Sequence, residues 1–370
     1  MLGVLYVYLT FTFLTKKKKL AFVNKPVSKL KKRKLLREIF YYKMKKVTKK
    51  IREIKKKLSD RSYHSRNKKK ALKILKGIEK VKGKTDPKLI KQSDKYAIEV
   101  LGWKGYAPWL YVYSAISQEF KEGWIPDNYF RKLVVPILKG NYGVISHYNS
   151  LTSRLFKSSH FPDCVYYSNG LWISPEYSVL SKKEVVDTAF NEHQKIVYKT
   201  DSSAQGKGVY FIEKNNFNIE KLEELGNGVI QSYINQHSFF HEITPNSVAT
   251  IRVTTAINDI GIVTINACYL RVGRNTDTHV MSNSHIRVSA DISTGKLHKY
   301  GYNTDWLQIE KHPDTNFLFE NKQIPFFNKI VDTVKKLHKM VPFARTIGWD
   351  VTIDVNNDVK IMEWNGGHND

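Results

Sequence analysis

Apolar residues recur at helical spacing along residues 30–80, where most of the other positions are lysine or arginine. They form three groups: Leu36, Ile39, Phe40 and Val47; Ile51, Ile54 and Leu58; and Ala71, Leu72, Leu75 and Ile78. This spacing predicts amphipathic helices. Polar residues at 60–62 and 65–67 interrupt the pattern, and we expect them to separate two or three helices. The sequence Gly-Lys-Thr-Asp-Pro at 83–87 predicts a linker after them.

The pattern becomes a mixture of helices and strands after residue 181. Closely spaced strands predict antiparallel hairpins, so we expect an α+β fold rather than a doubly wound sheet. The predicted helices cover 182–192, a segment from about 218, and 325–340; the predicted strands cover 195–199, 208–212, 228–233, 247–258 and 263–272. We expect three regions: a basic helical extension at 1–91, an N-terminal subdomain of the body at 92–185 and a core at 186–370.

Aromatic residues are dense between residues 92 and 182, which include Trp103, Trp109, Trp124 and Trp172. We interpret this density as hydrophobic core rather than as a ligand platform, because large aromatic side chains contribute most to core burial.

Residues 2–14 form a 13-residue apolar run, followed by four lysines at 16–19. A membrane-spanning helix needs about 20 apolar residues. A secretory signal carries its positive charge before the apolar run, not after it. Two readings stay open: a shallow membrane anchor held by the lysines, or a segment that is misassigned as translated or that packs on the body.

The positive charge is confined to the first quarter of the chain. The formal net charge is +27, and residues 16–91 hold 32 Lys and Arg against 5 Asp and Glu, whereas residues 92–370 hold 29 of each. A basic helical segment favours an anionic membrane surface, a nucleic acid or an acidic partner; the alternative is a solvated extension docked on the body. The sequence has no base-reading motif, so nucleic acid is less favoured.

The two cysteines, Cys164 and Cys268, are isolated in the sequence. This excludes a disulfide framework and a cysteine-rich zinc site and favours a reducing compartment. We therefore expect a cytoplasmic protein, peripheral at the inner membrane face if the basic segment binds lipid.

Residues 199–209 place a lysine at the end of a strand before a small polar loop with two glycines, Lys-Thr-Asp-Ser-Ser-Ala-Gln-Gly-Lys-Gly-Val. Backbone N–H groups of such a loop can bind phosphates while a lysine neutralises their charge. The loop is not a P-loop, because Asp201 stands at the position of the first glycine. A plain hairpin turn is the alternative interpretation.

A second cluster lies in the predicted hairpin at 348–354 and 359–365. If Asn356 and Asn357 form its turn, opposed residues sum to 713, and Asp350 lies across from Glu363, with Asn365 on the same face. The other face then receives Trp349, Val351, Ile353, Met362 and Trp364 as core. Directly opposed carboxylates repel, and a divalent cation such as Mg²⁺ removes that cost. The alternative is a solvated polar face.

Arg252 and Arg271 lie on predicted strands between these two clusters, where arginines can clamp phosphoryl oxygens. Each can equally be a surface residue. His237, His285 and His312 lack regular ligand spacing, so we expect no histidine metal site.

Taken in chain order, seven motifs between residues 95 and 370 resemble the sugar-transfer-associated family of ATP-grasp enzymes. They are Lys199 with Gly206-Lys207-Gly208; Val-Ile-Gln-Ser-Tyr-Ile-Asn-Gln-His at 229–237; Pro-Asn-Ser-Val-Ala-Thr-Ile-Arg-Val-Thr at 245–254; Asp-Ile-Ser-Thr-Gly at 291–295; His312-Pro313; Gly348-Trp349-Asp350; and Glu363-Trp364-Asn365. Each motif alone is ordinary, but seven in this order are specific.

The resemblance implies ATP held between two α+β subdomains. It assigns the α-phosphate to Lys199, the γ-phosphate or acyl-phosphate to Arg252, and a further phosphate contact to Lys157. The remaining implied ligands are the phosphate-covering loop with Ser203, Gln205, Gly206, Lys207 and Gly208; the adenine hinge with Gln231, Ser232, Tyr233 and Ile234; and the Mg²⁺ ligands Asp350, Glu363 and Asn365.

The reaction that the resemblance implies is ATP-dependent activation of a carboxylate as an acyl-phosphate, followed by attack of an amine or other nucleophile. The family name points to surface glycans, free or lipid-linked, as substrates. The alternatives are a kinase with a non-carboxylate acceptor and a nonenzymatic module that binds nucleotide or polyanions.

Two departures from the family pattern concern the site. Ala249 replaces an asparagine, which we expect to weaken a polar contact near the phosphates. The sequence Asn-Ser-His-Ile at 283–286 lacks the usual glycine pair, which alters a substrate loop.

Overall fold

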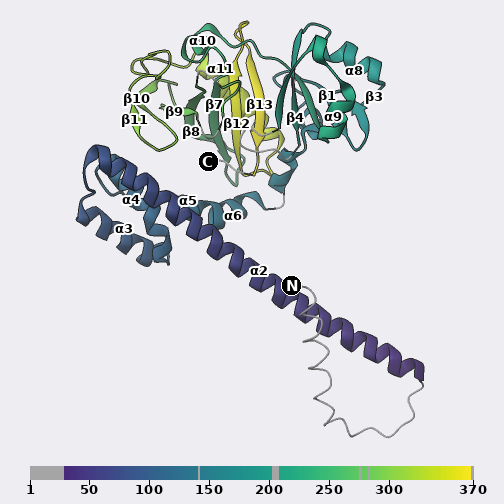
Figure 1. Cartoon of the computed structure of the whole chain (residues 1–370), viewed down its shortest axis with the longest axis vertical. Coiled ribbons are helices and arrows are strands. Elements are labelled where there is room, and N and C mark those ends of the chain that lie inside the picture. Colours follow the sequence, from purple (N-terminus) through teal and green to yellow (C-terminus); the bar gives the residue numbers. More distant parts are fainter. Residues whose placement is uncertain (1–28, 141, 202–207, 275–276, 282–283, 368–370) are drawn as a thin grey trace. The chain divides into compact units, whose positions relative to one another are not determined.

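The computed structural model describes residues 29–140, 142–201, 208–274, 277–281 and 284–367 (Figure 1). The chain divides into two units, residues 1–65 and 66–370. The described part of the first unit belongs to one helix, α2 (Lys29–Lys82), which continues into the second unit. The apolar run at 2–14 lies outside the described residues.

Helix α2 is continuous through residues 60–67, so the expected breaks there were wrong. No proline or glycine interrupts this stretch. Serine, asparagine and aspartate lower helix propensity by less than about 1 kcal/mol each, which the neighbouring turns overcome. The last turns also gain packing energy from helix α4 (Ala107–Ser117). The packed residues are Ala71, Ile74, Leu75 and Ile78 of α2 with Trp109, Val112 and Ala115. Among the described helices, α2 included, none combines the length and apolar character that crossing a bilayer requires.

The linker predicted at 83–87 is confirmed. Gly83 has a φ of +86°, which ends the helical path, and the Asp86 side chain accepts a hydrogen bond from the Lys88 N–H at 2.8 Å, which caps the next helix. The short helices that follow are α3 (Pro87–Glu99), α4 (Ala107–Ser117), α5 (Asp127–Tyr129), α6 (Val135–Lys139) and α7 (Thr152–Phe156).

The first sheet has six strands in the order β3-β2-β1-β6-β4-β5, and all neighbours are antiparallel. Its strands are β1 (Asp163–Ser168), β2 (Leu171–Ile173), β3 (Val179–Leu180), β4 (Lys195–Thr200), β5 (Val209–Glu213) and β6 (Gly228–Ser232). Helices α8 (Lys182–Ala189) and α9 (Ile219–Leu225) pack on it through apolar side chains such as Val185 and Leu222. Helix α8 begins where predicted because Ser181 and Glu184 form a capping box.

The second sheet has seven strands in the order β11-β10-β9-β8-β7-β12-β13, again antiparallel throughout. They are β7 (Thr250–Ile257), β8 (Val263–Val272), β9 (Ile286–Ala290), β10 (Leu297–Tyr302), β11 (Gln308–Ile309), β12 (Thr346–Ile353) and β13 (Val359–Asn365). Helix α10 (Ser238–Ile243) precedes β7 in the chain.

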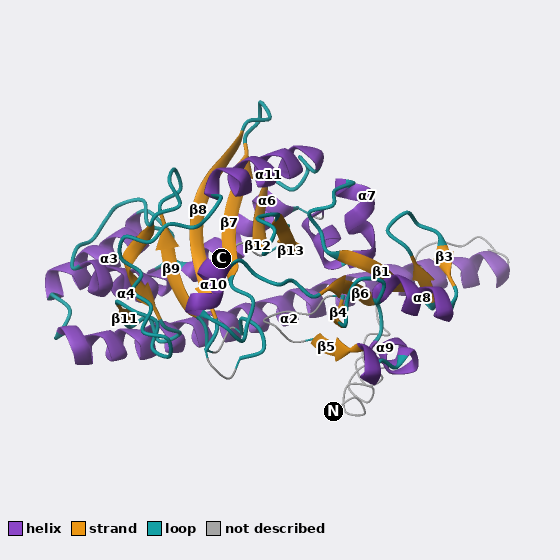
Figure 2. Cartoon of the chain, turned by 90° about the horizontal axis from the view of Figure 1, so that it is seen from above, coloured by secondary structure: helices purple, strands orange, loops and turns teal. Residues whose placement is uncertain are grey.

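Helix α11 (Phe327–Met340) crosses the strands of the second sheet (Figure 2). Phe327, Ile330, Val334 and Leu337 are buried at helical spacing and belong to the same core cluster as Ile251, Val253 and Val351 of the sheet. This cluster is the larger core of the second unit and fixes the strands on which the polar site stands.

The expected α+β class with antiparallel hairpins is confirmed. The first sheet takes strands from both sides of residue 185. The division at residues 91 and 185 stays a prediction.

Candidate active site

A cleft of about 900 Å³ in the second unit is lined by both sheets and by the helices that precede them. From the first sheet come Lys199 and Gln231, and from the second come Arg252, Arg271, Asp350, Glu363 and Asn365. The sequence-predicted phosphate, hinge and metal residues of these strands therefore line one cavity.

Asp350 and Glu363 are direct partners across β12 and β13, and Gly348 pairs with Asn365, as predicted. The route to this register differs from the prediction. Ile353 pairs with Val359, so the loop shifts the register by one residue, and a β-bulge at Met362 shifts it back before the acids.

The bulge also changes which residues face the core. Ile361 is fully buried there, whereas Met362 lines the cleft, so the expectation that Met362 belongs to the core face was wrong. The other predicted core residues of the hairpin, such as Trp349 and Trp364, are buried in the larger core. The cause is the extra residue, which places two successive side chains on the cleft side.

Two arginines hold Asp350. Arg252 lies opposite it on β7 and donates from Nε to Oδ1 at 2.6 Å and from Nη2 to Oδ2 at 3.1 Å, while Arg271 Nη2 lies 2.6 Å from Oδ1. Burial alone would raise the pKa of Asp350, but the two guanidinium groups outweigh it and lower the pKa. Asp350 is therefore ionised at neutral pH.

Glu363 has the opposite electrostatic environment. The protein surrounding it and the nearby Asp350 carboxylate both raise its pKa, against the opposing effect of Lys199 and the arginines. Glu363 is nevertheless an exposed residue, and it lines the cleft. A group whose charge is disfavoured in this way gains most from a cation bound beside it.

Lys199, at the end of β4, joins the two sheets. Its Nζ donates a hydrogen bond to the backbone oxygen of Met362 at 3.0 Å, across to the bulge of β13. Burial lowers its pKa, an effect that Glu363, Asp163 and Asp350 partly offset. The predicted lysine is thus close to the acid pair.

Asp163, which the sequence analysis missed, contacts the cleft residue Gln231. It pairs with Gln231 across β1 and β6, accepts from Gln231 Nε2 at 2.7 Å and from the Tyr166 hydroxyl at 2.8 Å, and its burial raises its pKa. One sequence signal could have found it. Asn169-Gly170 is a dipeptide that typically joins two strands of a hairpin, and the β-prone run before it begins at Asp163.

The predicted hinge at 231–234 lines the cleft. Gln231 is buried and turned toward Asp163, the Ser232 N–H donates to the Pro162 oxygen at 2.8 Å, and the Lys195 ammonium lies 4.7 Å from the centre of the Tyr233 ring. Contact between this segment and adenine stays a prediction.

The predicted phosphate loop joins β4 to β5, which pair as an antiparallel hairpin. Ser203, Gln205, Gly206 and Lys207 lie outside the described residues. Gly208 has a φ of +79°, a conformation that favours glycine, and its oxygen accepts from the Thr200 N–H at 3.0 Å.

Lys157 is exposed and ends helix α7 with a φ of +42°, its N–H donating to the Ser153 oxygen at 2.8 Å. It does not belong to the residues that line the cleft. The contact between Lys157 and a phosphate stays a prediction.

Ala249, which replaces the family's asparagine, is a core residue in this structure. Its side chain is fully buried in the core of the second sheet, and its N–H donates to the Gln236 side chain at 2.8 Å. Its neighbours Val248 and Thr250 line the cleft instead. The expected loss of a polar contact near the phosphates was therefore wrong, because this position faces away from the cleft.

His285 and Arg287 are cleft residues whose function the sequence did not indicate. Arg287 Nε donates to His285 Nε2 at 2.7 Å, so His285 Nδ1 carries the proton and donates to the Met281 oxygen at 2.6 Å. Burial and the Arg287 charge lower the pKa of His285 to about 4. His285 is therefore neutral at pH 7 and orients Arg287.

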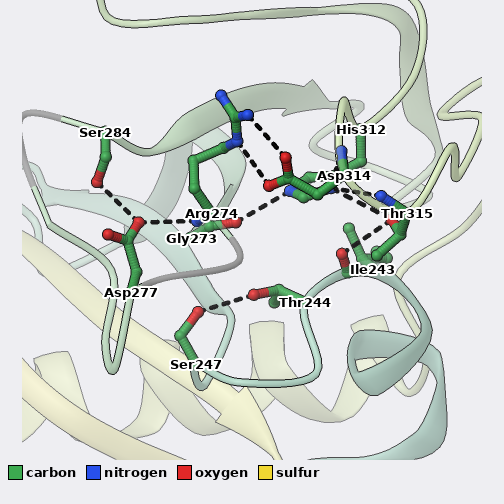
Figure 3. Close-up of polar contacts among 10 residues, drawn as sticks. All are labelled: Ile243, Thr244, Ser247, Gly273, Arg274, Asp277, Ser284, His312, Asp314 and Thr315. Atoms are coloured by element: carbon green, nitrogen blue, oxygen red, sulfur yellow. Dashed lines mark hydrogen bonds and ion pairs between the residues drawn. The ribbon is translucent and has the colours of Figure 1, made fainter.

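Figure 3 shows polar contacts of Gly273, Arg274, Asp277 and Ser284, which lie between β8 and β9 in the chain, several of them with residues 312–315. Arg274 forms a two-pronged ion pair with Asp314, at 2.6 and 2.7 Å, and Asp277 accepts from the Arg274 N–H and the Ser284 hydroxyl, both at 2.7 Å. His312 Nε2 lies 2.9 Å from the Gly273 oxygen. The His312-Pro313 motif thus has a structural role here.

The donor set fits Mg²⁺. No cluster of three His, Cys, Asp or Glu residues suited to a metal occurs in the described part of the chain, so a third donor beside the acid pair must be of another type. Asn365 supplies it: its side-chain Nδ2 is buried without a hydrogen-bond partner among the described residues. Rotating the side-chain amide by about 180° exchanges this nitrogen for the amide oxygen, and Mg²⁺ prefers oxygen ligands.

Comparison with curated protein sequences gave no match. Solved structures gave several. A biotin carboxylase in complex with β,γ-ATP from Campylobacter jejuni is 12% identical, with 80% of this chain and 63% of that chain covered and a TM-score of 0.39. An N5-carboxyaminoimidazole synthetase from Staphylococcus aureus complexed with ADP is 14% identical, with 58% and 43% covered and a TM-score of 0.36.

The biotin carboxylase domain of the Hydrogenobacter thermophilus 2-oxoglutarate carboxylase, in complex with MgADP, is 11% identical, with 60% and 40% covered and a TM-score of 0.35. The chain thus spans less than half the length of the first matched structures. The sequence profile described as "Sugar-transfer associated ATP-grasp" matches residues 165–369, which is more than half of the chain and includes the cleft residues of β7, β8, β12 and β13 discussed above. The chain therefore belongs to the sugar-transfer associated ATP-grasp family.

Proposed function

We propose that this protein is an ATP- and Mg²⁺-dependent ligase that joins a carboxylate to an amine or other nucleophile during glycan biosynthesis. The observation that carries the proposal is the directly opposed pair Asp350 and Glu363, with Asn365 on the same face, beside two arginines and a lysine in one cleft. This combination suits a metal-nucleotide whose phosphates need both cations and metal ligands.

The proposed reaction has two steps. A carboxylate oxygen of the substrate bonds to the γ-phosphorus of ATP while the bond to the β,γ-bridging oxygen breaks, and ADP leaves with the electron pair. The amine nitrogen then attacks the acyl carbon, the carbon–oxygen bond to phosphate breaks, and inorganic phosphate leaves as the amine loses a proton. Neither step requires a covalent bond to the protein, so positioning and charge carry the catalysis.

The residues of this chain act on the phosphates and the acid. Arg252 and Arg271, which hold Asp350 in the structure, can exchange that carboxylate for phosphoryl or substrate oxygens, because guanidinium groups bind both geometries through paired hydrogen bonds. Lys199 supplies a further charge next to the acid pair. Bound Mg²⁺ would supply charge neutralisation at the β- and γ-phosphates, held by Asp350, Glu363 and Asn365.

Substrate class and location are the finer parts of the proposal. The family description favours an acid or amine that belongs to a sugar, free or lipid-linked. The proposed location is the cytoplasm, because ATP is supplied there.

The test is calorimetric titration of the full chain with a non-hydrolysable ATP analogue, with and without Mg²⁺. We expect micromolar binding that depends on Mg²⁺ and that Glu363→Gln weakens at least tenfold. Glu224→Gln, an exposed glutamate on α9, is the matched control and should bind like the wild type. A folded wild-type protein that binds no nucleotide with Mg²⁺ present would contradict the proposal.

Hydroxylamine trapping distinguishes the ligase from a kinase. With ATP and a sugar acid, an acyl-phosphate reacts with hydroxylamine to give a hydroxamate, whereas a phosphorylated hydroxyl does not. We expect a hydroxamate together with ADP. ADP formation with a stable phosphorylated sugar and no hydroxamate would identify a kinase instead.

A further inference from the structure

The same cleft is lined by an aromatic wall, which we define as Trp109, Tyr113 and Trp306. Trp109 and Tyr113 lie on α4, and Trp306 lies in the turn between β10 and β11. The Trp306 and Tyr113 rings lie nearly parallel, 25° apart with centres at 6.2 Å, and Trp306 lies 5.9 Å from Trp109. Trp109 is almost fully buried, so Tyr113 and Trp306 provide the faces open to the cleft.

The backbone holds Trp306 in a costly position. Its φ is +63°, a region that bulky residues rarely adopt. The side chain of Asn303 fixes this turn by accepting from the N–H groups of Asp305 and Leu307, both at 3.0 Å. Such backbone strain persists where the surroundings enforce it and is concentrated at ligand sites.

The cleft that holds the aromatic wall also holds two arginines, Arg271 and Arg287. Arg271 reaches Asp350 with Nη2, but its Nε is buried and has no hydrogen-bond partner within the described part of the chain. Arg287 is oriented by His285, and both line the same cleft. A buried guanidinium nitrogen without a partner is costly, and a bound carboxylate supplies the missing acceptor.

We propose that the aromatic wall with Arg271 and Arg287 is the site for the carboxylate substrate, and that this substrate is an acidic sugar of the uronic-acid type. The inference rests on the proposed function. The apolar C–H face of a sugar ring packs on Trp306 and Tyr113, and its carboxylate meets Arg271 and Arg287. This places the reacting oxygen next to the acid pair, where the γ-phosphate would stand. Polar groups around the wall, Thr304 and Arg131 among them, suit sugar hydroxyls.

The test measures binding of D-glucuronate to the full chain by calorimetry, first without nucleotide and then with the ATP analogue and Mg²⁺. The comparison ligands are D-glucose, which lacks the acid, and propionate, which lacks the ring. We expect glucuronate to bind at least tenfold more tightly than either. Trp306→Ala and Arg287→Gln should each weaken glucuronate at least tenfold and leave analogue affinity unchanged. Trp103→Ala, an exposed tryptophan that does not line the cleft, is the control.

The variants give independent readouts, so Arg287→Gln decides the matter if Trp306→Ala does not fold. Glucuronate affinity that neither change alters, or equal affinity for propionate, would overturn the inference. If the wild type binds the analogue with Mg²⁺ but not glucuronate, the inference fails and the proposed function stands. If glucuronate binds as expected and no nucleotide does, the ligase proposal fails and the acid site stands.

A separate observation concerns the first unit. Six apolar residues of α2 are exposed and follow one another at alternating spacings of four and three, the pattern of a single apolar stripe. They are Phe40, Met44, Val47, Ile51, Ile54 and Leu58, each 40% to 59% exposed. We call them the α2 stripe.

The charges beside the α2 stripe indicate what covers it. Residues 29–65 contain 16 Lys and Arg against 3 Asp and Glu. A parallel coiled coil with a second copy would bring Lys50 of one helix beside Lys55 of the other, and these like charges repel. We propose that the α2 stripe enters the surface of an anionic bilayer, with the lysines at the phosphate level.

The test is sedimentation of the full chain with vesicles of phosphatidylcholine alone or with 30% phosphatidylglycerol. We expect binding to the anionic vesicles, reduced at least tenfold by the double change Ile51→Ser and Ile54→Ser. The matched change of both isoleucines to leucine should retain binding. No binding to anionic vesicles, equal binding by the serine variant, a dimer that the serine change dissolves, or tighter binding to a DNA duplex would each overturn the proposal.

Discussion

The Lys199 ammonium donates to the backbone oxygen of Met362, the residue that the β-bulge adds to β13. One hydrogen bond of 3.0 Å thus ties the end of β4 in the first sheet to the strand that carries Glu363 and Asn365 in the second. A bulge frees a carbonyl from the ladder and kinks its strand. Here the freed carbonyl fixes a cation beside the acid pair.

Replacing Lys199 with methionine should separate binding from stability. The change keeps the length of the side chain and removes the charge, so we expect at least a tenfold loss of affinity for the Mg²⁺–ATP analogue. Because a buried cation has a desolvation cost that its partners only partly offset, the free energy of unfolding should change by less than about 2 kcal/mol. Calorimetry and urea unfolding measure the two quantities. Unchanged affinity would show that Lys199 does not contact the nucleotide.

Gly228 has no room for a side chain. A Cβ there would lie 2.3 Å from the backbone oxygen of Lys199 and 2.9 Å from the Tyr198 ring. We expect Gly228→Ala to destabilise the fold by about 1–3 kcal/mol, the usual cost of overpacking, and to weaken nucleotide binding by displacing Lys199.

Gly77 is the matched control for this change. It lies inside α2, and a Cβ there meets no atom within 4 Å. Gly77→Ala should stabilise the fold by about 0.5–1 kcal/mol, because alanine has the higher helix propensity. Thermal unfolding of both variants measures the difference, and equal effects would contradict the assigned contact with Lys199.

The register rule applied to the sequence correctly paired Asp350 with Glu363, but it did not include the loop shift and the β-bulge that produce this pairing. Alternation and a turn signal place Asp350 opposite Glu363, but single-sequence patterns do not report a bulge, since it adds one residue without changing composition. The loop shift and the bulge cancel at the acids and not at Met362. Local spacing therefore located the candidate metal ligands and misassigned the side chain next to them.

Other parts of the site depend on contacts between residues far apart in the chain. Asp163 gains its environment from Gln231 and Lys199, and the aromatic wall joins α4 to the β10–β11 turn across almost 200 residues. The prediction that the aromatic-rich segment is core holds for Trp109, which is buried, but Tyr113 also lines the cleft. Periodicity cannot separate these two roles, because both positions lie on apolar helix faces.

Asp350→Asn should show how the arginines depend on their shared carboxylate. Removing one partner of a buried ion pair leaves uncompensated charge, and the side chains of Arg252 and Asp350 are each 9% exposed. We expect a loss of about 3–5 kcal/mol in the free energy of unfolding at pH 7. The matched control is Asp358→Asn, which removes the exposed ion pair with Lys329 and should leave the free energy of unfolding close to the wild-type value.

Asp350 also makes the free energy of unfolding depend on pH in the acid range. The folded-state pKa of Asp350 is lowered, so its stabilisation is complete above the unfolded value of about 3.9 and is lost as pH falls through the lower folded value. Asp350→Asn should reduce the loss of stability below pH 4. An unfolding free energy that falls equally in wild type and variant would contradict this assignment.

His285 predicts a second pH dependence at a different pH. Its folded-state pKa is about 4, below the unfolded value of about 6.5, so the unfolded chain binds an extra proton between these values. The stabilisation is complete above pH 6.5 and is lost as pH falls toward 4, by about 3 kcal/mol in total. His285→Gln should remove this part of the slope, measured by urea unfolding at half-unit steps between pH 4 and 7.

His312 and His338 also have lowered pKa values, so the wild-type slope contains their contributions and only the difference between proteins is informative. His241→Gln, at an exposed position on α10, is the control and should follow the wild type. A His285→Gln curve parallel to that control would mean that His285 is not held neutral between Met281 and Arg287. It would then also leave Arg287 without the contact that orients it toward the cleft, and Arg287 would have to be positioned by other groups.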